Sequence, residues 1–317
     1  MNQKPTISIV SPVYRAEKIV DELVQRIRNT LQGMAVTYEI ILVEDGSPDK
    51  SWVNIEKNCK KFPEVKGIKF SRNFGQHYAI SAGIEAASGN YCVVMDCDLQ
   101  DNPDYIPVMY EKAKAGADII FTHKKKRKHS LLKNLSAAIF FHLFNYLTDN
   151  KSKRADGTMG NYTMLSRKAM NAFCRIKDTH RHYLMILRLL GFKTDYLEIQ
   201  HNPRFEGKSS YTFSKLVAHA INGITSQSDK LLRISITVGF SCFAISVLWV
   251  LTLIVLYFTH GLVPGYTSLM AVILLSTGLI LMSIGVVGIY IGKIFEQVKE
   301  RPLYLVDEKI NFPSDTI

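Results

Sequence analysis

The sequence lacks the cysteine patterns that hold together many small extracellular and zinc-binding proteins. Only five of its 317 residues are cysteines, at positions Cys59, Cys92, Cys97, Cys174 and Cys242. The number is odd, and no two of them are spaced C-x-x-C. These absences exclude a disulfide scaffold, give no zinc signature, and favour a reducing compartment for most of the chain.

Charge of either sign is missing from one long stretch. No Asp, Glu, Lys or Arg occurs between Ile234 and Gly292, where two apolar runs, Ile234–Phe258 and Thr267–Ile291, flank a short loop. A run of this length rises about 37 Å as a helix, which exceeds the ~30 Å hydrocarbon core of a bilayer. The alternative is a pair of buried core helices, but such long helices almost always carry charge on one side. We predict two transmembrane helices within 234–291.

Basic residues flank this apolar region at both ends and are missing from the loop between the runs. They are Lys230, Arg233, Lys293, Lys299 and Arg301. By the positive-inside rule, both flanks face the cytoplasm. The first residues are polar and then become a strand, which is unlike a signal peptide. We therefore expect an integral membrane protein with a cytoplasmic domain, 1–230, and a cytoplasmic tail, 292–317.

The first 230 residues alternate between strand and helix patterns. With 47% hydrophobic residues and a net charge of +11, the chain is neither disordered nor collagen-like. Apolar runs predict strands at Ile7–Val13, Glu39–Val43, Val65–Phe70, Tyr91–Met95 and Asp118–Thr122. Helical patterns cover Glu17–Leu31, Gln76–Ala87 and Pro103–Ala115. This alternation predicts an α/β, Rossmann-like, doubly wound sheet that binds its ligand at the carboxyl ends of the strands.

Polar residues follow four of these strands, and the sharpest signal is the pair Asp96-x-Asp98. Two carboxylates at a strand end suit Mg²⁺ or Mn²⁺, which take one or two carboxylates together with substrate phosphates. Asp101 adds a third carboxylate, or alternatively caps a turn before Pro103.

A basic run, His123–His129, precedes an apolar stripe within Leu131–Leu147. The stripe fits a core-packing helix or an amphipathic helix in the membrane interface; with a bilayer nearby, we favour the interface. We expect juxtamembrane helices at 123–150 and 212–233, and no nucleic-acid binding.

Four motifs in order carry a family resemblance: Ser8–Tyr14, Val43–Asp49, Ser71–His77 and Met95–Asp101. Together with Arg204–Tyr211 and the two apolar runs, they resemble the inverting family-2 GT-A glycosyltransferases. The type resembled is the polyprenyl-phosphate glycosyltransferase, such as dolichyl-phosphate mannose synthases and bacterial undecaprenyl-phosphate sugar transferases. The resemblance implies a GT-A catalytic domain that transfers one sugar from a nucleotide sugar (UDP favoured, GDP possible) to a polyprenyl phosphate. It also implies the bacterial inner membrane, a cell-envelope pathway and a homo-oligomer.

The resemblance further implies roles for individual residues. The donor and acceptor would be bound by Pro12, Tyr14, Glu17, Glu44, Asp45, Arg72, Asp96, Gln100, Asp101, Asn161, Arg204 and Ser209. Asp96 and Asp98 would hold the metal ion and the diphosphate. The catalytic set would be Asp98, Asp156 and Arg204, in which the fork-shaped Arg204 guanidinium suits phosphate oxygens.

The chain departs from the family pattern at three positions. Glu44 replaces the usual Asp, Ser210 stands where a Lys is common, and Asn161 replaces the acidic residue often proposed as the base. Asp156 is a substitute base or a solvated loop carboxylate. A phosphate acceptor has a second pKa near ~6, so it needs positioning more than deprotonation.

Two other functions remain open at this point. A processive polysaccharide synthase would carry a Gln-x-x-Arg-Trp motif, and neither Trp52 nor Trp249 lies in one. A catalytically inactive membrane scaffold would explain Asn161 and Ser210 but not the retained Asp96 and Asp98.

Overall fold

The computed structural model describes residues 4–124, 159–179, 181–200, 230–260 and 265–313. The chain forms two compact units. The first comprises residues 1–129, 156–210 and 301–317, and the second comprises 130–155 and 211–300. Residues 125–150 and 212–229 of the expected juxtamembrane helices lie outside the described residues.

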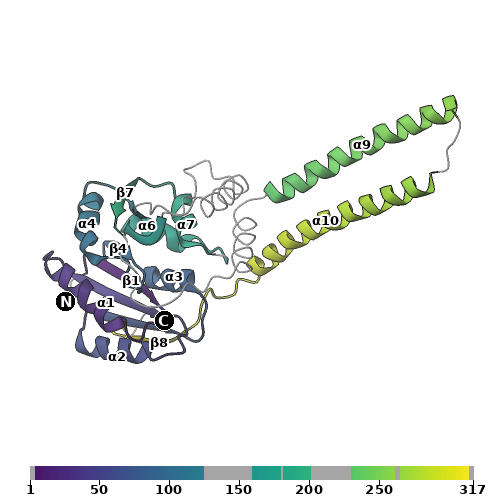
Figure 1. Cartoon of the computed structure of the whole chain (residues 1–317). Coiled ribbons are helices and arrows are strands. Elements are labelled where there is room, and N and C mark those ends of the chain that lie inside the picture. The colour runs from purple at the N-terminus through teal and green to yellow at the C-terminus, as the bar shows by residue number, and fades with distance from the viewer. Residues whose placement is uncertain (1–3, 125–158, 180, 201–229, 261–264, 314–317) are drawn as a thin grey trace. The chain divides into compact units, whose positions relative to one another are not determined.

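An eight-stranded sheet forms the centre of the first unit (Figure 1). Its strands are β1 (Ile7–Val13), β2 (Tyr38–Glu44), β3 (Val65–Phe70), β4 (Tyr91–Val94), β5 (Ile119–Lys124), β6 (Met159–Ser166), β7 (Thr194–Ile199) and β8 (Val306–Ile310). Their order across the sheet is β7-β5-β6-β4-β1-β2-β3-β8. The five strands predicted from apolar runs are present.

The sheet is mixed, whereas the sequence pattern suggested parallel strands. Strand pairs β1–β2, β1–β4, β2–β3 and β5–β7 are parallel. Strand β6 runs antiparallel to both β4 and β5, and β8 runs antiparallel to β3. The antiparallel β6 therefore places its amino end beside the carboxyl end of β4.

Helices cover both faces of the sheet. One hydrophobic core involves α1 (Val20–Gln32), α2 (Ser51–Lys61), and α4 (Ile106–Lys114), which follows the short 3₁₀ helix η1 (Pro103–Tyr105). The other core involves α3 (Gln76–Ala86), α6 (Arg167–Arg175) and α7 (Tyr183–Leu189). Strands such as β1 and β2 are buried on both faces, which explains their nearly continuous apolar sequences.

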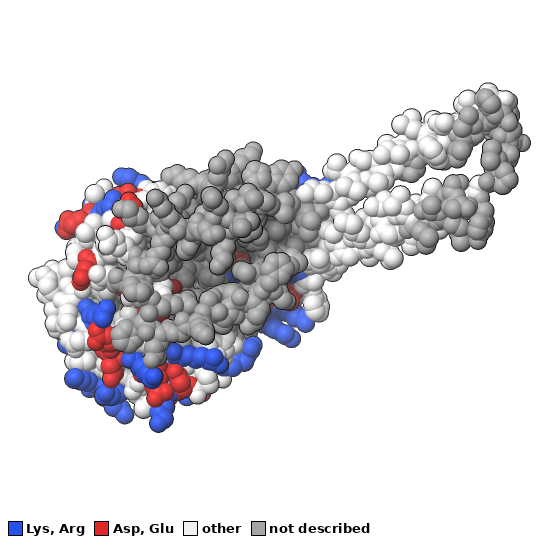
Figure 2. All heavy atoms as spheres, in the orientation of Figure 1, with Lys and Arg blue, Asp and Glu red and all other residues white. Residues whose placement is uncertain are grey.

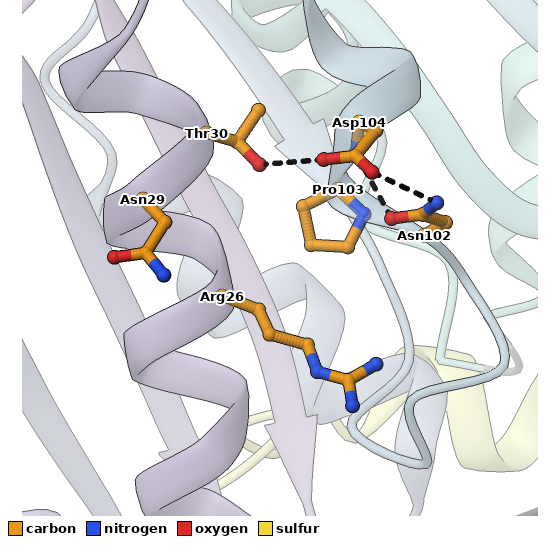
Figure 3. Close-up of a pocket in the computed structure, with 6 residues that line it drawn as sticks. All are labelled: Arg26, Asn29, Thr30, Asn102, Pro103 and Asp104. Carbon is orange, nitrogen blue, oxygen red and sulfur yellow. Dashed lines mark hydrogen bonds between the residues drawn. The ribbon is translucent and has the colours of Figure 1, made fainter.

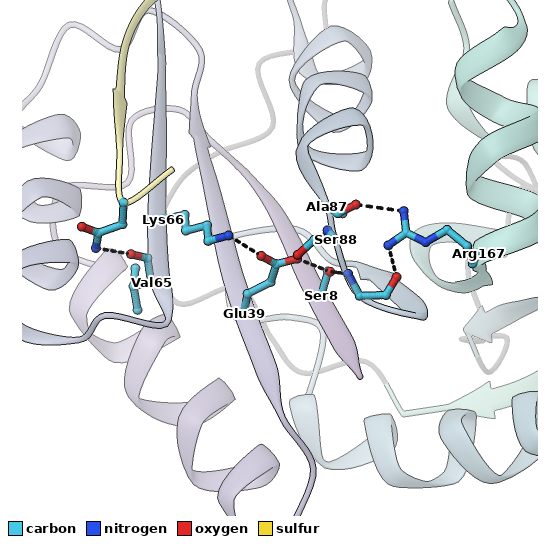
Figure 4. Close-up of polar contacts among 9 residues, drawn as sticks. Ser8, Glu39, Val65, Lys66, Ala87, Ser88 and Arg167 are labelled. Atoms are coloured by element: carbon cyan, nitrogen blue, oxygen red, sulfur yellow. Dashed lines mark hydrogen bonds and ion pairs between the residues drawn. The ribbon is translucent and has the colours of Figure 1, made fainter. Parts of the chain in front are cut away.

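A buried polar network supports the amino ends of the central strands (Figure 4). The Glu39 side chain is 3% exposed and accepts hydrogen bonds from Ser8 Oγ at 2.6 Å and Ser88 N at 2.7 Å. Lys66 Nζ lies 2.7 Å from the other Glu39 oxygen. Burial raises the pKa of Glu39, but these bonds outweigh it and hold the pKa below its usual value. The network is a structural element at the opposite end of the strands from the polar loops described below.

The described part of the second unit is a pair of long helices, α9 (Lys230–His260) and α10 (Tyr266–Val298). Both contain windows long and apolar enough to cross a membrane, Leu232–Trp249 and Leu275–Val298. None of the first window and 6% of the second is buried, so these are not core helices of the described fold. In Figure 2 most of the described atoms of the two helices belong to residues other than Lys, Arg, Asp and Glu. They are candidate membrane spans.

Candidate active site

Strands β4, β1, β2 and β3 lie side by side and parallel, so their carboxyl ends share one edge of the sheet. Asp45 follows β2, Arg72 follows β3, and Asp96 follows β4. In open α/β sheets, ligands bind outside the carboxyl ends of the strands. This edge is therefore the candidate site.

Asp45 is a buried carboxylate held by the loop after β3. It is 3% exposed and accepts hydrogen bonds from Phe74 N at 2.7 Å and Gly75 N at 2.9 Å. Asn73 Nδ2 donates to the same carboxylate at 3.1 Å. Burial raises the pKa of Asp45, and the two backbone bonds oppose that rise. The loop 73–75 thus fixes this acceptor at the sheet edge.

Gly46 lets the loops after β2 and β3 touch backbone to backbone. It has a φ of +59°. A Cβ here would lie 2.2 Å from Asn73 N and 2.3 Å from Arg72 C. Only glycine fits this left-handed position without moving the neighbouring loop.

Glu44 is turned into its own loop. The side chain is 2% exposed, and its carboxylate accepts a hydrogen bond from Ser47 N. Burial raises the pKa of Glu44, and hydrogen bonds from the Ser47 and Gly46 backbones only partly offset the rise. This carboxylate closes the turn after β2.

Asp96 is held by two side-chain amides from different elements. Its Oδ1 accepts a hydrogen bond from Gln76 Nε2, at the start of α3, at 2.7 Å. Asn161 Nδ2, on β6, lies 3.4 Å from the same oxygen. The antiparallel β6 brings Asn161 here, so in this structure Asn161 contacts Asp96 as a donor.

The residues after Asp96 form a tight loop. Asp98 Oδ1 accepts from Gln100 N at 3.1 Å, and the buried Leu99 between them has a φ of +60°. Asp101 is 4% exposed, and its Oδ2 accepts from Asp96 N at 3.2 Å. Asp101 therefore closes the loop that presents Asp96 and Asp98.

The model of the family described as Glycosyl transferase family 2 matches residues 8–173, from β1 into α6. The chain belongs to this family. The fold is accordingly GT-A-like, and the protein is a glycosyltransferase, as the motifs implied. The match contains Asp45, Asp96 and Asp98 together.

Relatives of this glycosyltransferase are similar over nearly its whole length. The glycosyltransferase YkcC of Bacillus subtilis (strain 168) is 34% identical over 97% of this chain and 95% of its own. A bactoprenol glucosyl transferase of Shigella phage SfII is 32% identical over 95% of this chain and 97% of its own. Among solved structures, glucosyl-3-phosphoglycerate synthase from Mycobacterium tuberculosis covers 70% of this chain and 77% of its own, at 16% identity and a TM-score of 0.48. The likeness to the two relatives includes both the candidate site and the apolar helices.

Three further residues implied to bind the donor lie around the end of β1. Pro12 is buried within the strand opposite Val43, and Tyr14 is 42% exposed. The Glu17 carboxylate accepts a hydrogen bond from Lys50 N at 3.3 Å, beside the start of α2. Glu17 thus links the loop after β1 to the residue before α2, whereas Tyr14 is exposed to solvent.

Arg72 is exposed in the loop that holds Asp45. Its guanidinium lies 4.3 Å from the centre of the Phe74 ring, within cation–π distance. The contact holds a positive charge beside the loop that binds Asp45.

Three of the expected site residues cannot be placed. Asp156, Arg204 and Ser209 lie outside the described residues, as does Ser210. Their roles remain predictions.

No three or more His, Cys, Asp or Glu side chains gather as a metal site within the described ranges. Asp96 and Asp98 nevertheless fit a hard divalent cation, because both are half-buried carboxylates on one loop at the sheet edge. Such a cation is usually completed by substrate phosphates and water rather than by further side chains.

A separate cavity of about 420 Å³ lies between α1 and η1 (Figure 3). It is lined by Arg26, Asn29, Thr30, Asn102, Pro103 and Asp104. Thr30 Oγ1 donates to Asp104 at 3.1 Å across it. Its lining includes none of the residues expected at the active site.

Asn73 and Gln76 lie within the motif Ser71–His77 that carries the family resemblance, but neither is predicted from the sequence as a site residue. Gln76 is separated from Asp96 by 20 positions, and no local pattern connects them. The sequence signal that could have identified Gln76 is its position: it is a polar residue at the start of α3, directly after a strand-end loop.

Proposed function

We propose that this glycosyltransferase transfers a single sugar, with inversion, from a nucleotide sugar to a polyprenyl phosphate at the cytoplasmic face of the bacterial inner membrane. The product would serve cell-envelope glycan synthesis or modification. A UDP-sugar is the favoured donor and a GDP-sugar the alternative, and we expect a homo-oligomer.

One observation carries this proposal. Relatives named bactoprenol glucosyl transferases are similar over 95% of the chain, which includes both the strand-end aspartates and the apolar helices. Bactoprenol is a polyprenol, so an enzyme that acts on its phosphate needs a membrane near its active site. The exposed apolar faces of α9 and α10 meet that need.

The strand-end residues support a nucleotide-sugar site. Asp45, which we expect to contact the base or ribose, is held at the sheet edge by the backbone amides of Phe74 and Gly75. Asp96 and Asp98 would hold Mg²⁺ or Mn²⁺, which would offset the negative charge that develops on the departing nucleoside diphosphate. Asp96 is oriented for this by the amides of Gln76 and Asn161.

The acceptor chemistry is compatible with an amide at position 161. Asn161 donates a hydrogen bond and cannot take a proton from the acceptor. A phosphate monoester has a second pKa near ~6, so it is already largely a dianion at neutral pH. Positioning and charge compensation, assigned to Arg204 and Ser209, then matter more than a base.

The chain topology supports a membrane hairpin with both ends on one side. Strand β8 follows α10 in the chain and pairs with β3 of the sheet that precedes α9. Because β8 is part of the same sheet as β3, the residues before α9 and after α10 lie on one side of any membrane that the helices cross. Two crossings, one by each helix, satisfy this requirement. The basic flanks assign that face to the cytoplasm.

The test is to incubate purified protein in detergent with undecaprenyl phosphate and a panel of UDP-, GDP- and dTDP-sugars, followed by mass analysis of the lipid. One panel member should add the mass of a single sugar residue to the lipid. Repeated additions would indicate a processive synthase, and no addition with any donor would favour an inactive scaffold.

Metal dependence is tested with Asp98→Ala in the same assay. This variant should lose essentially all turnover while its thermal unfolding midpoint stays near wild type, because Asp98 is a half-buried side chain on a loop outside the hydrophobic cores. Undiminished transfer by Asp98→Ala, or full activity of the wild type in excess chelator, would contradict the metal assignment.

A further inference from the structure

The chain returns to the catalytic sheet directly after the second apolar helix. Helix α10 ends at Val298, and β8 begins at Val306. The returning residues Arg301–Asn311, here called the C-terminal segment, belong to the same compact unit as the sheet. Ser71 N donates a hydrogen bond to Leu305 O at 3.0 Å. The segment is thus attached where β3 ends and the Asp45-holding loop begins.

Tyr304 contacts both a strand and a helix of the sheet unit. Its ring is stacked on Phe70, at the end of β3, with centroids 4.9 Å apart and planes 16° apart. Its hydroxyl donates to a carboxylate oxygen of Glu85 on α3. Burial, reinforced by Glu85, raises the pKa of Tyr304, so the phenol stays protonated as a donor. One side chain therefore joins the end of β3 to the helix that carries Gln76.

Phe70 contacts both Tyr304 and the loop that holds Asp45. Its ring lies edge-on to Phe74, with centroids 5.6 Å apart and planes at 85°. The backbone N–H of Phe74 is the one that donates to Asp45 at 2.7 Å. Phe74 packs against the core cluster that contains Phe70, and Tyr304 packs against the same cluster. A continuous aromatic stack thus connects Tyr304 with the amide that holds Asp45.

We propose that Tyr304 is a positioning residue for the nucleotide site, and that the C-terminal segment holds the loop Ser71–Gly75 in its binding conformation. This inference rests on the proposed function, in which Asp45 contacts the nucleoside. The C-terminal segment follows α10 directly in the chain. The second apolar helix is therefore joined by a few residues to the tyrosine that positions the donor site.

The test compares three variants of the full-length protein in detergent. Tyr304→Ala removes the stacked ring, and Tyr304→Phe keeps the ring but loses the hydroxyl bond to Glu85. Asn311→Ala is the matched control: its Nδ2 donates to Cys59 O at 2.7 Å and Val65 O at 2.8 Å, at the other end of β8. It weakens attachment of the same strand without touching the Asp45 loop.

Two readouts separate positioning from simple stability. Hydrogen exchange of peptides covering Ser71–Gly75 reports the loop directly, and binding of UDP with Mn²⁺ reports the donor site. In Tyr304→Ala we expect exchange about tenfold faster and UDP affinity about tenfold weaker, the upper end of what one aromatic pair contributes. The KM for the nucleotide sugar should rise with kcat nearly unchanged. Tyr304→Phe should stay within about threefold of wild type in each readout.

Asn311→Ala should lower the thermal midpoint while leaving both readouts unchanged. Equal effects of Asn311→Ala and Tyr304→Ala, or an unchanged loop in Tyr304→Ala, would overturn the inference. If Tyr304→Ala does not fold, Tyr304→Leu keeps most of the volume without the stacked ring and takes its place. If wild-type protein binds no UDP, GDP or dTDP, the proposed function fails, and the exchange data alone decide the inference.

Discussion

Replacing Gly46 by Ala should disrupt the site more than it disrupts the fold. The added Cβ would lie 2.2 Å from Asn73 N and 2.3 Å from Arg72 C. Ordinary carbon contacts are about 3.5 Å, so one of the two loops must move by more than about 1 Å. The backbone of the Asp45-holding loop is the obstacle, and no flexible side-chain end is available to give way. Movement of either loop changes how the Phe74 and Gly75 amides meet the Asp45 carboxylate.

Gly191 provides the control for the conformational part of this cost. It also has a positive φ, +65°, but a Cβ there meets nothing within 4 Å. Gly191→Ala should cost only the left-handed penalty of about 1–2 kcal/mol in the free energy of unfolding. Gly46→Ala should cost that penalty plus about 1–3 kcal/mol of overpacking.

The difference between the two variants measures the steric term. With about 2–4 °C per kcal/mol for a domain of this size, the thermal midpoint should fall by about 2–8 °C in Gly191→Ala and further in Gly46→Ala. A displacement of about 1 Å at the site should also lower kcat/KM about 10²-fold in Gly46→Ala. Gly191→Ala should keep wild-type kcat/KM. Indistinguishable midpoints and activities for the two variants would refute the backbone contact as the reason for glycine.

Three further predictions concern stability, the acceptor and topology. Burial alone would raise the pKa of Glu39, but its hydrogen bonds, that from Lys66 first, lower the pKa below the ordinary value near 4.5. The ionised Glu39 therefore stabilises the fold above that value, and this stabilisation is lost as the pH falls through the pKa of the folded state. Glu39→Gln should therefore unfold about 3 kcal/mol more easily at pH 7 and show a flatter midpoint-against-pH curve in acid, whereas parallel curves would contradict this. In single-turnover assays, Asp156→Asn should lower the rate less than about tenfold and Arg204→Ala more, with wild-type rate falling below pH ~6; the reverse order would make Asp156 the base. A reporter fused at Ile317 should be active in the cytoplasm, and activity only in the periplasm would refute the orientation.

The central half of the sheet was predictable because its signals are local. Strands β1 and β2 are nearly continuous apolar runs buried on both faces, and the bounds of β1, β2 and β3 lie close to the predicted ones. Parallel strands end at one edge, so polar residues that follow them, such as Asp45 and Asp96, converge without further information. The placement of these two carboxylates at the sheet edge followed from the apolar runs and their alternation with helical segments.

The antiparallel strands were not predictable because their pairing is a tertiary effect. The segment Val306–Ile310 carries Asp, Glu and Lys, and four of its five residues are exposed. Such a charged strand at a sheet edge has no apolar run to identify it, and it is held by β3 on one side only. Strand β6 pairs antiparallel with β4 and β5 and so does not continue the regular β-α repeat. Its position in the sheet therefore could not be predicted from that repeat.

The position of Asn161 shows how a departure in sequence is explained by a partner that the sequence did not indicate. Taken alone, an amide in place of an acidic residue suggested either a lost base or an inactive enzyme. In the structure, β6 brings this amide to Asp96, where Gln76 donates to the same oxygen from α3. A carboxylate at position 161 would instead set a second negative charge beside Asp96, which like charges disfavour. The amide therefore has the chemistry of a group that orients Asp96. Under the proposed function, an acceptor phosphate that is already ionised needs no base at this position.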